Sequence, residues 1–342
     1  MPGKTQSDNP AVKITPKGVA RLRAGHVWVY RSDVTAPEGV PPGALVDVSD
    51  TRGKLLGSAL YSSSSQIALR MLSGKPLPAA ELPALLRDRL HAALEYRQKV
   101  VHESDACRLV FSEADGLPGL IVDRYHDLIS FQALTQAMDQ RKEGLMAQVG
   151  DELKPAAIVE RVEARIRELE QLPAAETRIV CGDKSKTVVT MNGVKFHFDA
   201  LAGQKTGAFL DQRENYAAAA RYARGRALDV FCYQGGFALH VASRCESVTG
   251  VDSSRPALEQ AEQNAALNGR EIEWIEANAF DLLRDYSDSG TQYDSIVLDP
   301  PAFAKTRKTL ETAMRGYKEL NLRALKMLRP GGVLVTCSCS YH

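Results

Sequence analysis

The 342-residue chain lacks the features that define several large classes of protein. No apolar run approaches the ~20 residues of a membrane-spanning helix, and the polar segment 1–18 lacks the apolar core of a signal peptide. The six cysteines form no CxxC pair and no zinc-ligand spacing. Lysine and arginine number 43 against 42 for aspartate and glutamate, so the net charge does not indicate a nucleic-acid binder. We therefore expect a cytoplasmic protein with free thiols, no bound metal and no membrane segment.

The charge is unevenly distributed, and the N-terminal segment is basic. Residues 1–70 contain nine lysines and arginines against five aspartates and glutamates. Five of these cations lie near the aromatic residues Trp28 and Tyr30 in the sequence: Lys13, Lys17, Arg21, Arg23 and Arg31. Cations that pair with phosphates and rings that stack on bases are typical of RNA contact. A solvated sheet edge explains the same pattern equally well.

Turn residues and apolar periodicity predict three domains. Short strands separated by glycine and proline predict a small β-barrel over 1–75. A linker helix with leucines at helical spacing and a small α/β domain are expected over 76–185. From 186 to 342, a hairpin with an Asn-Gly turn precedes strands that alternate with helices. That alternation predicts a Rossmann-like parallel sheet with helices on both faces. Such a sheet normally has further strands, so we expect the C-terminus to be truncated.

Two strand patterns near the C-terminus each precede a reactive group. The strand at 295–298 is followed by Asp299-Pro300-Pro301, and the strand at 333–336 is followed by Cys339. Ligands bind beyond the carboxyl ends of the strands in an open parallel sheet, so both groups should face one crevice. A carboxylate and a thiol together suggest covalent chemistry on an electrophilic ring.

Three further residues at strand ends predict an adenosine-containing ligand in the same crevice. Gly235 lies where the first strand turns into a helix, and glycine there lets the backbone approach a ligand. Asp252 ends the next strand, where a ribose-binding carboxylate belongs, and Asn278 follows the third strand at the adenine position. A turn glycine, a helix N-cap and a surface loop residue are the alternatives for these positions. The G-x-G-x-x-G spacing of dehydrogenases is absent.

In this order, the motifs resemble those of class I S-adenosylmethionine-dependent methyltransferases. The resemblance is closest to the bacterial 23S ribosomal RNA cytosine-5 methyltransferases that have an N-terminal PUA domain. It extends over nearly the whole chain, and its most specific segments are EADGLPGLIVDRY and GQKTGAFLDQR. It implies that S-adenosylmethionine is the cofactor and that an unpaired or protein-poor region of 23S ribosomal RNA is the partner. The oligomeric state stays open, with a homodimer as one candidate.

The resemblance also implies roles for single residues. The cofactor-binding set that it suggests is Gln204, Lys205, Gln212, Phe231, Tyr233, Gly235, Asp252, Asn278 and Asp299. Cys339 falls on the family's nucleophile in the SCS motif. Its thiolate would add to C6 of cytosine and make C5 nucleophilic, and Asp299 would stabilise charge on the ring. Cys337 receives no role.

One departure from the family pattern keeps an alternative open. Many RNA cytosine-5 methyltransferases have a second cysteine after the motif IV proline, whereas Ala302 and Phe303 follow Pro301 here. An aromatic residue after DPP also occurs in enzymes that methylate exocyclic amines of adenine or guanine. The SCS motif favours cytosine C5. A non-catalytic RNA-binding or ribosome-assembly protein is the third hypothesis.

Overall fold

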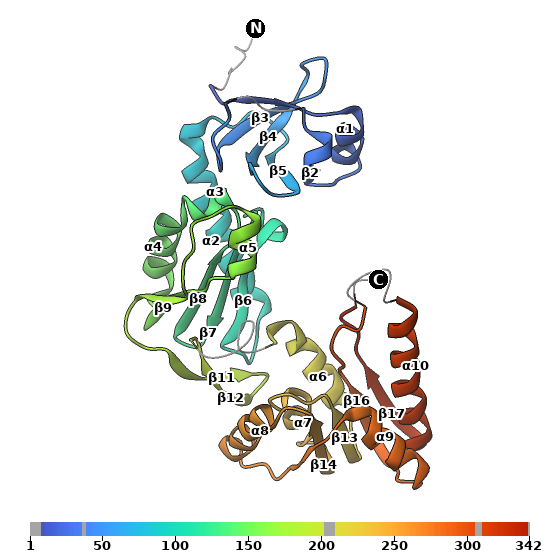
Figure 1. Cartoon of the computed structure of the whole chain (residues 1–342). Coiled ribbons are helices and arrows are strands. Elements are labelled where there is room, and N and C mark those ends of the chain that lie inside the picture. The colour runs from blue at the N-terminus through green and yellow to red at the C-terminus, as the bar shows by residue number, and fades with distance from the viewer. Residues whose placement is uncertain (1–7, 36–38, 202–208, 305–309, 341–342) are drawn as a thin grey trace. The chain divides into compact units, whose positions relative to one another are not determined.

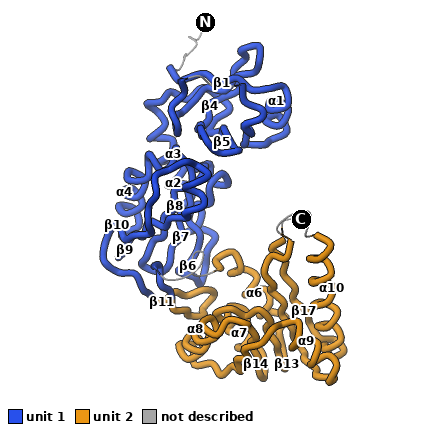
Figure 2. The backbone as a smooth tube through the Cα atoms, viewed as in Figure 1, with its two compact units in different colours: residues 1–187, 198–207 blue, residues 188–197, 208–342 orange. Residues whose placement is uncertain are grey.

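The computed structural model describes residues 8–35, 39–201, 209–304 and 310–340. The chain divides into two compact units, which Figure 2 shows in separate colours. One unit consists of 1–187 with 198–207, and the other of 188–197 with 208–342. Among the described residues, every helix is too short or too polar to cross a membrane.

The first unit begins with a five-stranded sheet in the order β1-β3-β4-β5-β2. Its strands are β1 (Ala11–Lys13), β2 (Trp28–Tyr30), β3 (Leu45–Ser49), β4 (Leu55–Tyr61) and β5 (Ile67–Ser73). The expectation of a purely β module misses the helix α1 (Pro16–Arg23). Thr15 caps this helix by accepting the Gly18 N–H, and Pro16 occupies the first turn, where its missing N–H has no cost.

A second sheet in the same unit has the order β10-β9-β8-β7-β6. Its strands are β6 (Ala106–Phe111), β7 (Leu120–Tyr125), β8 (Leu128–Ala133), β9 (Ala157–Glu160) and β10 (Arg178–Cys181). Its helices are α2 (Leu82–Val100), α3 (Gln136–Asp139), α4 (Lys142–Leu153) and α5 (Ala164–Leu169). The short helix η3 (Ser112–Asp115) follows β6. The apolar stripe predicted from residue 82 onward is the buried face of α2.

One hydrophobic core joins the two sheets of the first unit. Leu45, Leu60 and Leu72 of the first sheet lie in the same buried cluster as Leu90 of α2 and Phe131 of β8. The opposite face of the first sheet has its own smaller core. The first sheet is therefore buried on both faces, one of them against the second sheet's domain.

The second unit contains a parallel sheet in the order β15-β14-β13-β16-β17. Figure 1 labels four of these strands, β13, β14, β16 and β17. Its strands are β13 (Gly225–Val230), β14 (Cys245–Asp252), β15 (Glu273–Glu276), β16 (Tyr293–Leu298) and β17 (Leu328–Thr336). Its helices are α6 (Arg213–Tyr222), α7 (Gly236–Val241), α8 (Arg255–Leu267), α9 (Ala279–Asp288) and α10 (Leu310–Met327). This arrangement of strands and helices confirms the predicted Rossmann-like α/β fold. Helix α6 was not indicated by the sequence pattern.

The three central strands of this sheet, β13, β14 and β16, bury side chains on both faces. Leu228 and Val230 belong to the core that α9 and α10 cover with Leu283 and Leu320. Asp229, between them in the strand, points to the other face, where its carboxylate accepts the Ala238 N–H of α7. The hairpin of β11 (Lys186–Met191) and β12 (Val194–Asp199) precedes the sheet in sequence. Its turn residues, Asn192 and Gly193, both have positive φ, as the Asn-Gly signal predicts.

Candidate active site

The loop that follows β13 has an unusual backbone. Phe231 and Tyr233 have φ values of 67° and 50°, a region that costs a non-glycine residue about 1–2 kcal/mol. Gly235 also has a positive φ, 82°, so every second residue from 231 to 235 lies in the left-handed region. The N–H of Phe231 bonds to the Val251 carbonyl, and that of Tyr233 bonds to an Asp252 carboxylate oxygen at 2.9 Å. Neighbouring strand β14 thus holds the loop in its strained form.

Gly235 is required for space as well as for its φ. A Cβ on Gly235 would lie 2.8 Å from Cη2 of Trp274, and one on Gly250 would lie 2.3 Å from Cζ3 of the same ring. The indole of Trp274 on β15 therefore covers two glycines, one in the loop and one in β14. Sequence reasoning identified Gly235 but not the ring that requires it.

Asp229, at the end of β13, is a buried carboxylate with one free oxygen. The residue is 1% exposed, and its Oδ2 accepts the Ala238 N–H at 2.8 Å. Its Oδ1 has no hydrogen-bond partner among the described residues. Burial raises the pKa of Asp229 to about 8, and the charges of Asp299 and Asp252 add to the effect. Sequence reasoning missed this residue. A single aspartate among apolar residues in a strand could have indicated a functional carboxyl group.

Asp252 and Asn278 lie at the ends of β14 and β15, as predicted, and both have local structural roles. Asp252 accepts the N–H groups of Tyr233 and Ser254, one on each oxygen. Asn278 caps α9 by accepting the Phe280 N–H at 2.9 Å. Each side chain keeps hydrogen-bonding capacity, since a carboxylate oxygen accepts more than one bond and the Asn278 amide nitrogen is a donor.

Asp299 forms the centre of a small polar group at the end of β16. Gln212 donates its amide N–H to Oδ2 of Asp299 at 3.0 Å, and the Cys337 thiol also bonds to this carboxyl. Burial raises the pKa of Asp299 to about 6, with a further contribution from the charge of Asp211. The structure thus brings together Gln212 and Asp299, two members of the cofactor-binding set that the resemblance implied.

The two cysteines after β17 are in different environments. Cys339 is exposed, and its Sγ lies 3.7 Å from the Pro300 carbonyl oxygen, beside the DPP segment. Cys337 is half-buried, and burial next to Asp299 raises the pKa of its thiol to about 12. The structure therefore places both thiols at the carboxyl end of the sheet, with Cys337 rather than Cys339 bonded to Asp299.

The segment before α6 also reaches this end of the sheet. Gln204 and Lys205 lie outside the described residues. Phe209 packs edge-on against Tyr233, with ring centroids 5.4 Å apart. From α6, the buried Tyr216 lies over Gly236, where a Cβ would meet its hydroxyl at 2.5 Å. Sequence reasoning missed Tyr216 because it did not identify α6.

Comparison with known sequences and structures gives the family. A sequence model of PUA-like domains matches residues 12–74, and one of S-adenosylmethionine-dependent methyltransferases matches 157–341. This chain belongs to the S-adenosylmethionine-dependent methyltransferases. The enzyme is 35% identical to "Ribosomal RNA large subunit methyltransferase I" of Photobacterium profundum over 93% of this chain and 83% of that protein. It is 37% identical to the protein of that name from Shewanella amazonensis, over 96% and 85%.

Solved structures confirm the fold of this methyltransferase. SMU.776, a methyltransferase crystallised with SAH, superposes with a TM-score of 0.79 over 95% of this chain and 85% of its own. A methyltransferase from Agrobacterium tumefaciens superposes with a TM-score of 0.51 over 71% and 74%. The identities are 18% and 20%, so these structures show the fold alone.

The residues of this methyltransferase fit its cofactor electrostatically. The ends of three strands carry Asp229, Asp252 and Asp299. The charges of Asp252 and Asp299 raise the pKa of Asp229, and Asp252 accepts the Tyr233 N–H. Helix N-termini normally make this end of a sheet favourable for anions, whereas the oxygens of these three aspartates are hydrogen-bond acceptors that suit a cation. S-adenosylmethionine carries a sulfonium and an ammonium group, and the free Oδ1 of Asp229 is an acceptor for such a cation.

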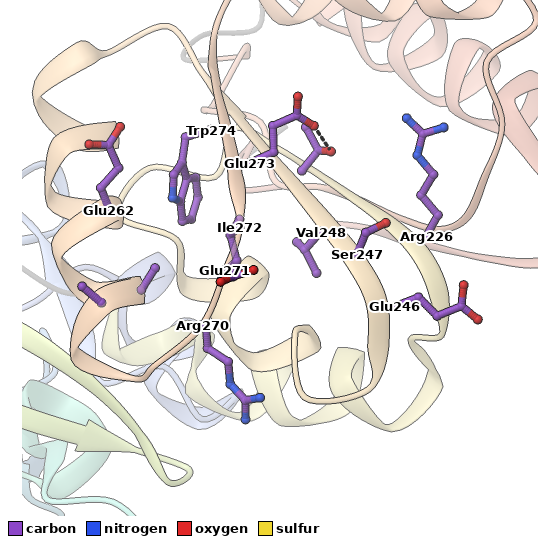
Figure 3. Close-up of a pocket in the computed structure, with 13 residues that line it drawn as sticks. Arg226, Glu246, Ser247, Val248, Glu262, Arg270, Glu271, Ile272, Glu273 and Trp274 are labelled. Atoms are coloured by element: carbon purple, nitrogen blue, oxygen red, sulfur yellow. Dashed lines mark hydrogen bonds between the residues drawn. The ribbon is translucent and has the colours of Figure 1, made fainter.

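A groove of about 780 Å³ lies elsewhere in the methyltransferase unit, toward the amino ends of β13, β14 and β15. Figure 3 shows Arg226 and Glu246 on one side of this groove and Glu262 and Trp274 on the other. None of the predicted cofactor or catalytic residues lines it. Because ligands in this fold bind at the carboxyl ends of the strands, the groove is not the active site.

Proposed function

We propose that this methyltransferase methylates C5 of a cytosine in large-subunit ribosomal RNA, with Cys339 as the nucleophile. The observation that carries the proposal is the exposed Cys339 thiol beside the Pro300 carbonyl, next to Asp299 at the cofactor end of the sheet. The names of the relatives and the match to PUA-like domains support ribosomal RNA as the substrate.

The different environments of the two thiols support Cys339 over its neighbour. Only a thiolate adds to a pyrimidine ring, and a thiol with a pKa of about 12 stays protonated at neutral pH. Cys337 is such a thiol. Its place against Asp299 makes it a positioning residue for the carboxyl, because its bond and that of Gln212 fix where the carboxyl points.

Asp299 and Cys339 have complementary tasks in the proposed reaction. The Cys339 sulfur forms a bond to C6 of cytosine, and the ring's electron pair moves toward N3 and C5. Asp299, whose pKa is about 6, donates a proton to N3 and so neutralises the developing charge. Bound S-adenosylmethionine supplies the methyl group that C5 takes. A base then removes the C5 proton, the electron pair left on C5 expels the Cys339 thiolate from C6, and N3 returns its proton to Asp299.

The target base must be accessible to the thiol. In a helix, stacking shields C6, so the cytosine must be unpaired or flipped out of its stack. We propose that residues 1–75 bind RNA, that 76–185 link this module to the catalytic domain, and that 186–342 perform the chemistry. A cytoplasmic location and a homodimer stay predictions.

Methylation of an exocyclic amine is a second candidate. Two observations favour it: Pro301 is not followed by a second cysteine, and the aromatic Phe303 lies close behind it. Phe303 packs against Tyr317 with ring centroids 4.9 Å apart. An aromatic ring in this position suits an enzyme that holds a purine. Such an enzyme requires no thiol.

Product analysis separates the two candidates. Incubation with methyl-labelled S-adenosylmethionine and unmodified large-subunit ribosomal RNA should yield 5-methylcytosine after digestion to nucleosides. Cys339→Ala should abolish the product, whereas the matched control Cys337→Ala should retain part of the activity. RNA containing 5-fluorocytosine should trap a covalent complex with the wild-type protein and not with Cys339→Ala. Full activity of Cys339→Ala, or a methylated amine as product, would refute the proposal.

A further inference from the structure

Four aromatic side chains of the first unit are partly exposed, and each has an arginine over its ring. Trp28 and Tyr30 are 37% and 38% exposed, and Phe111 and Tyr96 are 52% and 57% exposed. The guanidinium carbons lie 5.0 to 5.7 Å from the ring centroids, within the range of cation–π contact. The pairs are Arg21 with Tyr30, Arg70 with Trp28, Arg97 with Tyr96 and Arg108 with Phe111.

Each of these arginines is also held by a carboxylate. Arg108 forms two bonds to Asp123, at 2.8 and 3.0 Å, and Asp123 is fully buried. The other anchored pairs are Arg21 with Asp33, Arg70 with Glu113 and Arg97 with Asp115. An arginine fixed at one edge loses little further freedom when another group stacks on it. The rings therefore rest on a prearranged layer of guanidinium groups.

Glu113 connects the two sheets of this unit at the surface. Its carboxylate accepts the Trp28 indole N–H at 2.7 Å and also bonds to Arg70 and to the Ser112 hydroxyl. Trp28 belongs to β2, whereas Glu113 belongs to η3, directly after Phe111 at the end of β6. Burial alone would raise the pKa of Glu113, but these bonds and the Arg70 charge outweigh it and lower the pKa. Glu113 therefore stays ionised and holds Trp28 beside the second sheet.

We propose that Trp28, Tyr30, Phe111 and Tyr96 form a stacking surface for unpaired RNA, with rings from both domains of the first unit. Bases stack on aromatic rings and on guanidinium planes without regard to sequence. The proposal deepens the proposed function, since it identifies how a ribosomal RNA substrate is held outside the active site. It also assigns the EADG segment, through Glu113, the role of positioning Trp28.

Cations at the rim of the surface favour RNA over a protein partner. Arg21 of α1 covers Tyr30, and the same helix exposes Lys17 and Arg23. Neither Lys17 nor Arg23 forms an ion pair among the described residues. Both are therefore available for phosphates, whereas the carboxylates beneath the rings are already neutralised by arginines. Arg31 does not contribute, because its guanidinium bonds to the carbonyls of Ser62 and Ser65.

Binding of a fluorescein-labelled, unstructured RNA to the full chain tests the surface. Trp28→Ala and Phe111→Ala should each raise the Kd roughly 5- to 150-fold, the usual loss for one stacked base. Trp28→Phe, which keeps a ring, should lose less than Trp28→Ala. Leu55→Ala is the matched control, since this residue is 40% exposed on the same sheet and lies outside the surface, and its Kd should not change. A duplex of the same sequence should bind more weakly.

Two further measurements separate this inference from the proposed function. Calorimetric binding of S-adenosylhomocysteine should be the same in all variants, which shows that the catalytic unit is folded. In methylation assays, Trp28→Ala and Phe111→Ala should raise the KM for RNA and leave kcat unchanged. Wild-type RNA affinity in both alanine variants would overturn the surface, whatever product the enzyme makes. Tight RNA binding through Trp28 without 5-methylcytosine would instead contradict the proposed function and leave the surface standing.

Discussion

Replacing Gly235 by alanine should destabilise the catalytic unit through two separable effects. The backbone at Gly235 has φ 82°, which costs an alanine about 1–2 kcal/mol. The added Cβ would lie 2.8 Å from the Trp274 ring, and overpacking of this kind costs about 1–3 kcal/mol. We therefore expect a loss of about 2–5 kcal/mol in the free energy of unfolding. Gly269→Ala is a matched control, because Gly269 has φ 59° but no atom near its added Cβ.

Urea denaturation followed by tryptophan fluorescence measures this loss. In a Trp28→Phe background, Trp274 is the remaining tryptophan and reports on the catalytic unit alone. Gly235→Ala should lower the unfolding free energy by more than Gly269→Ala, and the difference is the steric part. Adding Trp274→Phe to Gly235→Ala should recover some of the steric loss in unfolding free energy. Because this double variant has no tryptophan left in the Trp28→Phe background, its unfolding is followed by circular dichroism. Equal losses for the two glycines would refute the contact with Trp274.

Three other predictions follow from the pKa shifts. The folded-state pKa of Asp229, about 8, exceeds its unfolded value, so its contribution to stability is present below pH ~4 and is lost as the pH rises to about 8. Asp229→Asn should therefore show a flatter stability profile over pH 4–8 in parallel urea titrations, and unchanged profiles would contradict the buried carboxyl. If Asp299 donates a proton to the base, kcat/KM should fall as the pH rises above about 6, and Asp299→Asn should lack this limb in a pH–rate profile. Iodoacetamide at pH 8 should alkylate the exposed Cys339 and spare Cys337, because the pKa of the Cys337 thiol is about 12. Tandem mass spectrometry of the peptide that contains both cysteines would show which one is labelled. Faster labelling of Cys337 would reverse the proposed roles.

The sequence predicted the catalytic fold well because the central strands β13, β14 and β16 are buried on both faces. Runs such as 295–298 contain consecutive apolar residues, and this pattern is strong for a central parallel strand. The polar residues at the ends of those strands could be assigned to one crevice because parallel strands share their carboxyl edge. Asp252, Asn278 and Asp299 accordingly lie at the ends of β14, β15 and β16.

Contacts between distant segments could not be predicted in this way. The bond between Trp28 and Glu113 joins residues 85 positions apart, and no local pattern indicates it. The same holds for Tyr216 over Gly236, because α6 is rich in alanine and lacks a long apolar stripe. The bond from Cys337 to Asp299 depends on how the chain turns after β17, which spacing alone does not determine.

The core shared by the two sheets of the first unit has a consequence for folding. Leu45, Leu60 and Leu72 face the second sheet's domain, so a fragment ending near residue 75 would expose them to water. The segment that looks like an independent module in the sequence is therefore one part of a larger cooperative unit. Hydrogen exchange should show the amides of β4 and those of β8 opening together, in a single step. Grafting this module alone onto another enzyme would transfer its RNA-facing rings without the packing that keeps it folded.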